Sequence, residues 1–373
     1  MTASLAQHCA DLVPKLVARA AQAERERKVP GESIGELTAI GVFRSLTPQR
    51  YGGSQLATVA AYSALIELGR GCAATAWVST LFAAHSFLIT AFGQRTQDEV
   101  WAAGPDALIA SSIAPVGEAK AVDGGYVVRG KWSFASGIDH ATWIVLCAFV
   151  KDDRDSETPP FQYFFVVPAA DLVIEDDWHV SGLCATGSKS VRLSDVFVPA
   201  HRAEAVVKLM MRPLPWHALF GLIFSAPAIG NALGMLDDFR AYLATRRGVY
   251  SGEKFKDRST SLIRLAEAAA EIDAARLLLL RDLHEIDEAV AAGKPLRRAS
   301  YDRTQYDAAY IVQTCARAVD RLFAASGGRA LYATSTLQRR FRDMHANTQH
   351  AFVDLDVAGE RYGKALVDTA TSG

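Results

Sequence analysis

Three hydroxyl side chains alternate with other residues at the end of the segment Gly182–Ser190, which reads Gly-Leu-Cys-Ala-Thr-Gly-Ser-Lys-Ser. Its spacing is similar to that of a phosphate-binding P-loop, but Ser188 stands where the lysine of that motif belongs. The segment also precedes a β-like stretch, whereas a P-loop opens a helix. No Gly-x-Gly-x-x-Gly run occurs in the sequence, so the chain carries no nicotinamide-binding fingerprint.

Other residues that could carry chemistry lack the spacing that the common motifs need. His345 and His350 are five residues apart, which places them about 140° apart around a helix, so they cannot share one zinc ion. Ser136 is not part of a Gly-x-Ser-x-Gly turn, which gives a serine hydrolase little support. The five cysteines are an odd number and form no Cys-x-x-Cys pair. We therefore predict neither a disulfide framework nor a metal site.

Composition indicates a globular protein without an electrostatic preference for polyanions. The chain has 40 Lys and Arg against 41 Asp and Glu, which gives a net charge of −1 and no field that would attract nucleic acid or anionic lipid. The N-terminus carries Asp11, Lys15 and Arg19 among its alanines, so it is not typical of a signal peptide. A reduced, cytoplasmic protein is predicted.

The residue composition and the spacing of apolar residues change twice along the sequence, which predicts three domains. Residues 1–105 are rich in Ala, Leu and Glu with helical apolar spacing, residues 106–205 contain short β-branched and aromatic runs bounded by turn residues, and residues 206–373 are helical again. Helices are expected at about 58–70, 73–91, 262–291 and 301–325, and from about 336 through His350. The predicted fold class is mainly α with a central β domain.

One apolar stretch, Trp216–Leu236, is long enough to suggest a membrane span. It is interrupted by a histidine, a proline and an asparagine, and a membrane span would normally be cleaner. We therefore expect a buried core helix and no membrane association.

Several local sequences resemble the acyl-CoA dehydrogenase fold. They are Ser111–Pro115 (SSIAP), Gly130–His140 (GKWSFASGIDH), Trp178–Ser188 (WHVSGLCATGS), Ala244–Gly248 (ATRRG), and Ser326–Gly328 (SGG) followed by Arg342–Asp343. The resemblance implies an N-terminal helical domain, a middle β-barrel domain and a C-terminal four-helix bundle. The Trp-x-Phe-x-Ser-Gly-x-x-His stretch resembles the flavin-dependent monooxygenase branch, which includes the oxygenase components of para-hydroxyphenylacetate and secosteroid hydroxylases.

Departures from the dehydrogenase branch favour the monooxygenases. The dehydrogenases use a glutamate as base, and this chain has Ala351 at one of the two family positions and Phe220 or its apolar neighbours at the other. His350 lies beside the missing glutamate, which fits the monooxygenase branch. In the flavin loop, Ala185 replaces a glycine that relatives usually carry.

The resemblance implies the oxygenase component of a two-component flavin-dependent monooxygenase. Such an enzyme uses reduced flavin (FADH2 or FMNH2) from a separate flavin reductase, together with O2, to hydroxylate an aromatic substrate such as a phenol, an indole or a polyketide. Two alternatives stay open, namely an N-oxygenase of an amine or amino sugar and an acyl-CoA dehydrogenase-like flavoenzyme or flavin-fold binding protein. The four consecutive leucines Leu277–Leu280 cover all sides of a helix, which predicts at least a dimer, and the resemblance points to a homotetramer.

The resemblance also assigns catalytic residues. Ser136 matches the position whose side chain contacts the central nitrogen of the flavin, although it could instead cap a turn. His350 is the candidate base that takes the substrate proton, because imidazole accepts a proton near neutral pH. His85 lies in an apolar helix where an unpaired imidazole is costly, and relatives place a histidine of this helix near the activated oxygen.

The remaining candidates would bind the cofactor. Thr186, Ser188 and Ser112 offer hydroxyls for the flavin, although an ordinary turn would use Thr186 and Ser188 equally well. Trp132 could lie against the flavin ring, or belong to the core as strand aromatics usually do. Arg246 matches an arginine that reaches the flavin diphosphate of a neighbouring subunit, and its alternative is a solvated helix end.

Overall fold

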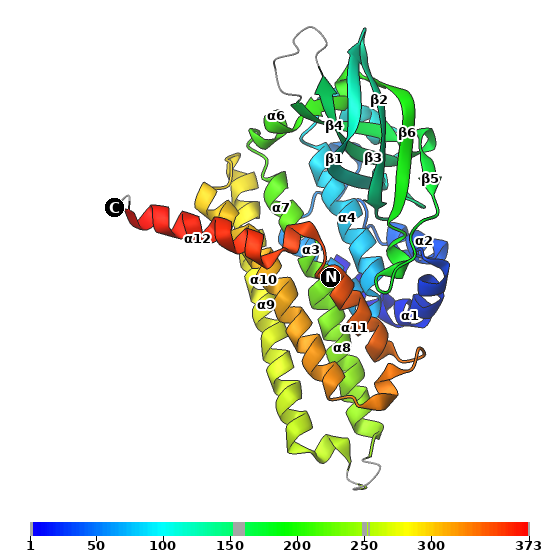
Figure 1. Ribbon diagram of the computed structural model, residues 1–373, viewed down its shortest axis with the longest axis vertical. Coiled ribbons are helices and arrows are strands. Elements are labelled where there is room, and N and C mark those ends of the chain that lie inside the picture. The colour runs from blue at the N-terminus through cyan, green and yellow to red at the C-terminus, as the bar shows by residue number, and fades with distance from the viewer. Residues whose placement is uncertain (1–2, 152–160, 248–251, 253, 372–373) are drawn as a thin grey trace.

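The computed structural model describes residues 3–151, 161–247, 252 and 254–371. The β domain lies between two helical parts in the sequence, and in Figure 1 its sheet lies at the top of the molecule with most of the helices below it. The N-terminal helices are α1 (Leu5–Glu26), α2 (Gly31–Ala39), α3 (Thr58–Gly71), α4 (Ala73–Ile89) and α5 (Gln94–Val100). The expected class, mainly helical with a central β domain, is confirmed.

Among the described residues, the β domain forms a mixed sheet of seven strands in the order β5-β6-β2-β1-β3-β4-β7. Its strands are β1 (Ile109–Val122), β2 (Gly125–Ala135), β3 (Trp143–Lys151), β4 (Phe161–Pro168), β5 (Val173–Glu175), β6 (Lys189–Pro199) and β7 (Ala203–Ala205). β1 and β3 run parallel with Ser111 opposite Val145, and the other pairs are antiparallel. The sheet curves but ends in two edge strands, β5 and β7, where a closed barrel was expected.

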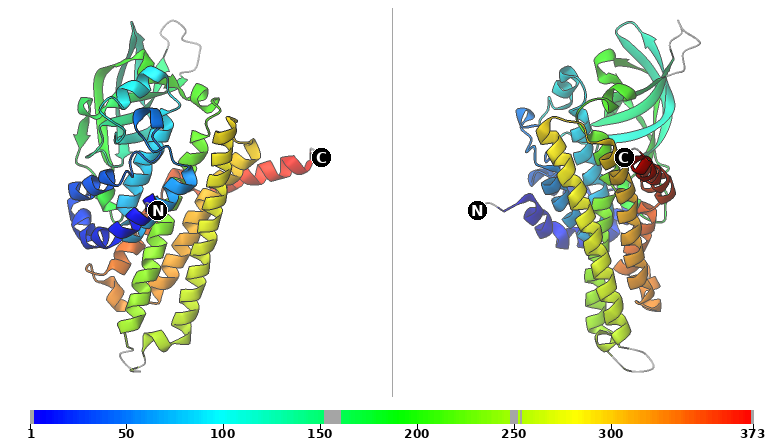
Figure 2. Two further views of the ribbon diagram at one scale, coloured as in Figure 1. Left: turned by 180° about the vertical axis from the view of Figure 1, so that it is seen from behind. Right: turned by 90° about the vertical axis from the view of Figure 1, so that its left-hand side faces the viewer.

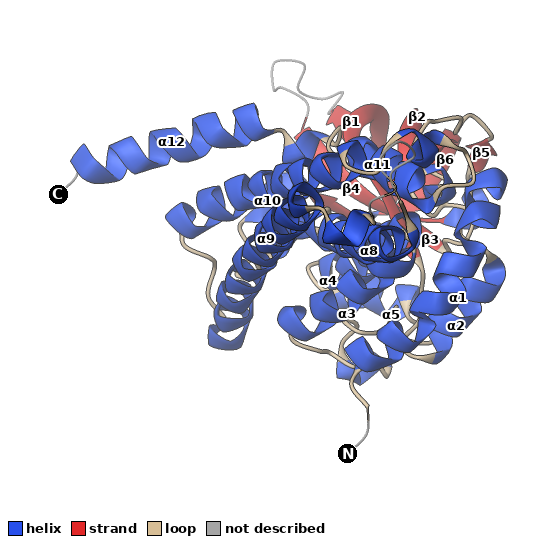
Figure 3. Ribbon diagram, turned by 90° about the horizontal axis from the view of Figure 1, so that it is seen from below, coloured by secondary structure: helices blue, strands red, loops and turns tan. Residues whose placement is uncertain are grey.

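The C-terminal helices form a bundle that extends away from the sheet (Figure 2). The bundle comprises α7 (Trp216–Leu222), α8 (Ser225–Thr245), α9 (Ser259–Ala292), α10 (Arg298–Ala324) and α11 (Thr336–Asn347). The short helix α6 (Val206–Met210) packs against β4 and β7, and α12 (Leu355–Thr371) ends the described chain. α8, α9 and α10 pack together, and α11 lies against α8 and α10. The last helix, α12, projects from the body of the molecule (Figure 3).

Helix α4 is the element around which the domains assemble. Every residue from Ala73 to Ile89 is buried. A helix that is apolar on all sides needs neighbours all round, and α4 contacts α3, α8, α7 and β1. The polar side chains of α4 can therefore meet residues from all three parts of the chain.

The apolar stretch that suggested a membrane span is the interior of the bundle. Residues Trp216–Thr245 are long and apolar enough to cross a membrane, but 89% of their most apolar window is buried inside the protein. The stretch forms two helices, α7 and α8, where the sequence predicted one.

Two glycines allow the N-terminal helices to approach the bundle closely. α3 crosses α8 at Gly69 and Gly230, and a Cβ on Gly69 would lie 2.8 Å from the Cα of Gly230. A Cβ on Gly230 would lie 2.6 Å from the Cα of Gly69. Real Cβ atoms do not approach this closely, so only glycine fits at both positions.

Candidate active site

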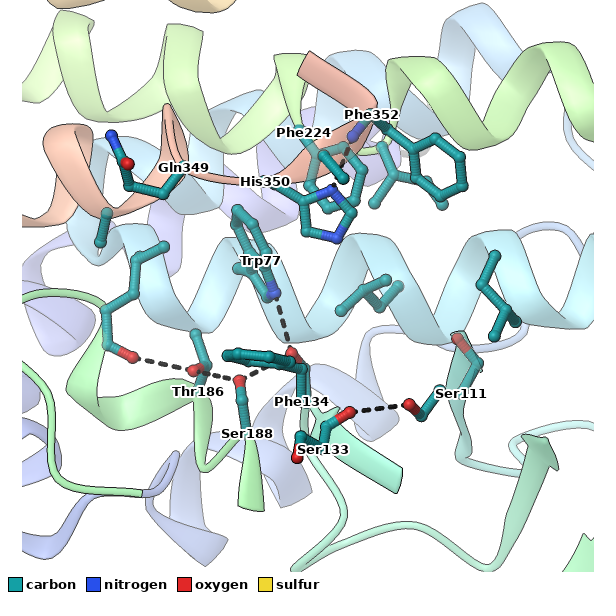
Figure 4. Close-up of a pocket in the computed structure, with 18 of the residues that line it drawn as sticks. Trp77, Ser111, Ser133, Phe134, Thr186, Ser188, Phe224, Gln349, His350 and Phe352 are labelled. Carbon is teal, nitrogen blue, oxygen red and sulfur yellow. Dashed lines mark hydrogen bonds between the residues drawn. The ribbon is translucent and has the colours of Figure 1, made fainter. Parts of the chain in front are cut away.

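A cavity of about 650 Å³ lies where α4, α7, the edge of the sheet and the segment after α11 meet. Figure 4 shows Trp77 of α4, Phe134 of β2 and His350 after α11 facing one another across it. Aromatic and aliphatic side chains make up most of its surface. No Asp, Glu, Lys or Arg is among the described residues that line it.

A chain of hydrogen bonds runs along one wall of this cavity (Figure 4). The indole N–H of Trp77 donates to Ser136 Oγ at 3.1 Å. Ser136 Oγ lies 2.7 Å from Ser188 Oγ, which lies 2.6 Å from Thr186 Oγ1. Thr186 Oγ1 donates to the carbonyl oxygen of Leu183 at 2.8 Å. The structure thus brings together three residues that the sequence singled out, Ser136, Thr186 and Ser188, and adds Trp77.

Local backbone geometry holds these hydroxyls in place. Thr186 ends a short 3-10 turn (Cys184–Thr186) between two left-handed residues, Leu183 with φ 51° and Gly187 with φ 53°. The backbone N–H of Gly137 donates to the carbonyl oxygen of Thr186 at 2.8 Å. This bond fastens the end of β2 to the turn, so that Ser136 and Ser188 face each other.

A second polar group consists of His85 and Ser111. His85 is fully buried, and its Nδ1 donates to the carbonyl oxygen of Ile109 at 2.6 Å. Ser111 Oγ lies 2.9 Å from His85 Nε2. Burial lowers the pKa of His85 to about 4, so the imidazole is neutral near pH 7 with its one proton on Nδ1. Its Nε2 must then accept the hydroxyl proton of Ser111.

His350 lies on the opposite side of the cavity, between aromatic rings. Its ring stacks on Phe224 with centroids 3.8 Å apart and meets Trp77 edge-on at 5.9 Å. Burial lowers the pKa of His350 to about 4. Its Nδ1 accepts the backbone N–H of Phe352 at 3.2 Å, so the neutral ring carries its proton on Nε2. The expected helical position was wrong, because α11 ends at Asn347 and His350 caps the next 3-10 turn.

Trp132, a candidate for contact with the flavin, does not line the cavity and lies in the core, the other place that the sequence allowed for it. Trp132 is fully buried within the sheet, where its Nε1 donates to the carbonyl oxygen of Cys147 at 2.7 Å. Two residues later, Phe134 lines the cavity and meets Trp178 edge-on at 6.0 Å. Phe134 has φ 64°, and the register of β2 with β6 shifts between Trp132 and Ala135. Such an irregularity re-aims side chains, and here it turns Phe134 toward the cavity.

The two other cofactor candidates have different surroundings. Ser112 lines the cavity, and its Oγ donates to the carbonyl oxygen of Ser133 at 2.7 Å. Arg246 follows the last residue of α8, roughly 30 Å along this helix from Phe224 at the 1.5 Å rise per residue. Its guanidinium lies 5.2 Å from the ring centroid of Tyr242, and its Nε is buried without a hydrogen-bond partner. It does not contact the cavity of its own chain.

The side chains that line the cavity are chemically suited to bind a flavin ring. A flavin is a flat aromatic system with a polar edge, and here Trp77, Phe134 and Phe224 offer aromatic surface while the hydroxyls of Ser136 and Ser188 face the same space. Trp77, Ser111 and Phe134 were missed from the sequence. The signal for Trp77 was an indole N–H inside a fully buried helix, which requires a partner.

Comparison with known proteins gives a consistent result. Residues 3–104 match the N-terminal domain of acyl-CoA dehydrogenases and residues 222–355 match their C-terminal domain. The chain is 36% identical over 367 residues to the flavin-dependent monooxygenase oxygenase subunit HsaA of Rhodococcus jostii, covering 94% of this chain and 95% of that protein. It is 32% identical to the oxygenase component of p-hydroxyphenylacetate 3-hydroxylase of Acinetobacter baumannii, covering 98% and 89%.

Solved structures show the same relationship. The 3-HSA hydroxylase from Rhodococcus sp. RHA1 superposes with a TM-score of 0.91 at 34% identity, covering 98% of this chain and 97% of that one. XiaF from Streptomyces sp., in complex with FADH2 and glycerol, superposes with a TM-score of 0.92 at 27% identity, covering 98% and 95%. The chain therefore belongs to the flavin-dependent monooxygenases of the acyl-CoA dehydrogenase fold, as an oxygenase component that uses reduced flavin and O2.

Proposed function

We propose that this enzyme hydroxylates an uncharged aromatic substrate that carries a ring hydroxyl or a ring N–H. The bound flavin supplies two electrons, so that one atom of O2 replaces a ring hydrogen as hydroxyl, the other leaves as water, and the flavin is oxidised. The chain itself must bind the ring, orient its polar group and exclude water. The observation that carries the proposal is the neutral His85–Ser111 pair in a cavity lined without charged side chains.

The His85–Ser111 pair is suited to accept a proton from the substrate. Ser111 donates its own proton to His85 Nε2, so its oxygen keeps lone pairs that can accept from a substrate O–H or N–H. An aromatic ring becomes more nucleophilic as this proton leaves. A base with a pKa of about 4 does not hold the proton at rest, so the transfer accompanies oxidation of the ring. This assigns to His85, through Ser111, the role of base that the sequence had assigned to His350.

His350 is suited to the opposite task. With Nδ1 accepting from Phe352, its Nε2–H can only donate a hydrogen bond. Its ring is fixed by the stack on Phe224. We therefore assign to His350 a donor role, toward an oxygen atom that gains negative charge during the reaction.

The uncharged lining favours an aromatic substrate over an amine. An ammonium group in this cavity would have no carboxylate beside it among the described residues, and a carboxylate would have no Lys or Arg. An unpaired charge in a buried site is costly, whereas aromatic walls bind a neutral ring without this penalty. The N-oxygenase of an amine or amino sugar is accordingly the weaker candidate.

The proposed partners are a flavin reductase and further copies of the chain. The sequence has no nicotinamide fingerprint, so the chain alone should not oxidise NADH, and rapid oxidation would exclude the two-component scheme. On α9, Ile263 and Leu277 are 57% and 60% exposed, which supports the proposed homotetramer. Light scattering should return an oligomer, and a monomer at micromolar concentration would also remove the proposed role of Arg246.

The substrate proposal can be tested with three phenols that differ mainly in charge, namely 4-ethylphenol, 4-hydroxyphenylacetate and tyramine. Each is mixed with enzyme, chemically reduced flavin and O2, and catechol product and hydrogen peroxide are measured. We expect the neutral phenol to give at least about tenfold more product per flavin than either charged one, because of the cost of burying an unpaired charge. A preference for a charged phenol would overturn the proposed substrate class, and peroxide without any product from a wider aromatic panel would overturn the hydroxylase proposal.

A further inference from the structure

The hydrogen-bond chain along the cavity wall has one favoured direction. An indole N–H can only donate and a carbonyl oxygen can only accept. Trp77 therefore donates at one end, and the carbonyl of Leu183 accepts from Thr186 at the other. With the Thr186 proton on this carbonyl, the order that keeps every bond of the chain has Ser136 donating to Ser188 and Ser188 donating to Thr186.

This direction determines what Ser136 can offer to a ligand. Its single proton is held by Ser188 and one lone pair is taken by Trp77, which leaves one lone pair. Because Ser136 lines the cavity, it presents an acceptor and no donor to a molecule placed there. Reversing the chain would turn the Thr186 proton from Leu183 to Ser188, so the bond from Thr186 Oγ1 to the Leu183 carbonyl oxygen would be lost, which is unfavourable.

Oxidised and reduced flavins differ in whether the ring nitrogen N5 accepts or donates a hydrogen bond. The ring nitrogens N1 and N5 of the oxidised flavin are bare acceptors, whereas the reduced ring carries a proton on N5. An acceptor in the wall forms a hydrogen bond with an N–H and is repelled by a bare nitrogen. We propose that the ordered chain from Trp77 to Leu183 makes this site select reduced over oxidised flavin, with Thr186 and Ser188 as positioning residues that keep the Ser136 proton out of the cavity.

This inference rests on the proposed function in so far as the cavity holds the flavin ring. It goes further by giving the enzyme a physical reason to accept flavin from a reductase and to release it once oxidised. The expected preference is on the order of tenfold from this contact, since one hydrogen bond is made in the reduced state and lost in the oxidised state.

The test measures binding in place of turnover. Oxidised FAD and dithionite-reduced FAD are titrated anaerobically into the wild-type chain and into Thr186→Val, Thr186→Ser and Trp77→Phe, and the two dissociation constants are compared. Thr186→Val removes the hydroxyl that orders the chain, so Ser188 can donate to Ser136 and the Ser136 proton can turn into the cavity. The preference for reduced flavin should then fall by about tenfold, which corresponds to about 30 mV in the midpoint potential of the bound flavin.

The two other variants are matched controls. Thr186→Ser keeps a hydroxyl at the same place and should keep the preference. Trp77→Phe removes the donor at one end, but the Leu183 carbonyl still orders the hydroxyls, so the preference should also persist. Thermal melts establish that each variant is folded, and Ser188→Ala, which also frees the Ser136 proton, replaces Thr186→Val if that variant is not.

The outcomes separate the inference from the proposed function. Equal affinity of the wild-type chain for both flavin states, or an unchanged preference in Thr186→Val and Ser188→Ala, would overturn the inference while leaving the hydroxylase proposal intact. Failure of both flavin states to bind would instead count against the cavity as the flavin site.

Discussion

The cavity and the interface between α9 and α10 bury polar side chains in opposite ways. In the helix interface, Arg281 lies 3.1 Å from Asp282 and also contacts Asp307, and Arg303 lies 3.6 Å from each of these carboxylates. In the cavity, the ionisable side chains among the described lining residues are two histidines, both held neutral by burial. Paired charges fix one helix against another, whereas neutral groups with unused lone pairs or protons can meet a ligand.

The largest effect is expected where a charge loses its counter-charge. Arg303→Met should lower the free energy of unfolding by about 3 kcal/mol, because Asp282 and Asp307 are left with less positive charge in a buried position. Urea denaturation followed by circular dichroism measures the change. Arg303→Lys keeps the charge and should be less destabilised. If Arg303→Met were as stable as the wild type, the paired charges of this cluster would not stabilise the interface between α9 and α10.

On the other side of the comparison, Ser111→Ala should leave stability nearly unchanged and slow hydroxylation by on the order of a hundredfold, as expected when general-base catalysis is lost. The deficit should shrink for phenols that are already ionised at the assay pH. Product formation and peroxide release measure the effect. Ser86→Ala is the control, since Ser86 is buried on the same helix as His85 but bonds to the carbonyl of Phe82 outside the cavity. An equal loss in both variants would assign Ser111 to structure.

A smaller effect is expected at His350, and its pattern distinguishes a donor from a base. His350→Ala should slow product formation by about tenfold, the contribution of one hydrogen bond to a developing charge. This loss should be the same for neutral and for pre-ionised phenols, because a donor does not take the substrate proton. A loss that disappears with ionised phenols would restore the base role that the sequence suggested.

The smallest effect concerns pH. Both histidines have a pKa of about 4, below the ordinary 6.5, so they stay neutral and product yield per flavin should be constant between about pH 6 and 8 for a phenol that is itself neutral there. As the pH falls from 6.5 toward 4, the unfolded chain binds protons that the folded chain refuses, so the free energy of unfolding should decrease. A midpoint in product yield between pH 6 and 7 would contradict this.

The sequence predicted many of the residues that line the cavity, but not the hydrogen bonds that they form there. Ser136, Thr186, Ser188, His85 and His350 were each found in short local patterns, and they do meet at one site. What they do there depends on partners distant in the chain. The direction of the hydrogen-bond chain depends on the carbonyl oxygen of Leu183, and the chain also includes Trp77, which is 59 residues before Ser136.

Two differences between the expected and the observed positions of side chains have a common physical origin in backbone details. Trp132 and Phe134 share one face of a regular strand, and only the positive φ of Phe134 and the shift in register separate the core residue from the cavity residue. In the sequence, His350 continues the polar pattern of α11, but in the structure the helix ends three residues earlier at Asn347. Periodicity predicts the type of an element well and its ends poorly.

The crossing of Gly69 over Gly230 has a consequence for how such enzymes can be recombined. Two backbones in direct contact tolerate no added methyl group on either side, so the partners are constrained jointly. A chimaera that joins the first hundred residues of one relative to the bundle of another inherits one glycine from each parent and works only if both carry theirs. Because the catalytic cavity draws on both sides of this junction, a chimaeric cavity can form only where the two parents meet this condition.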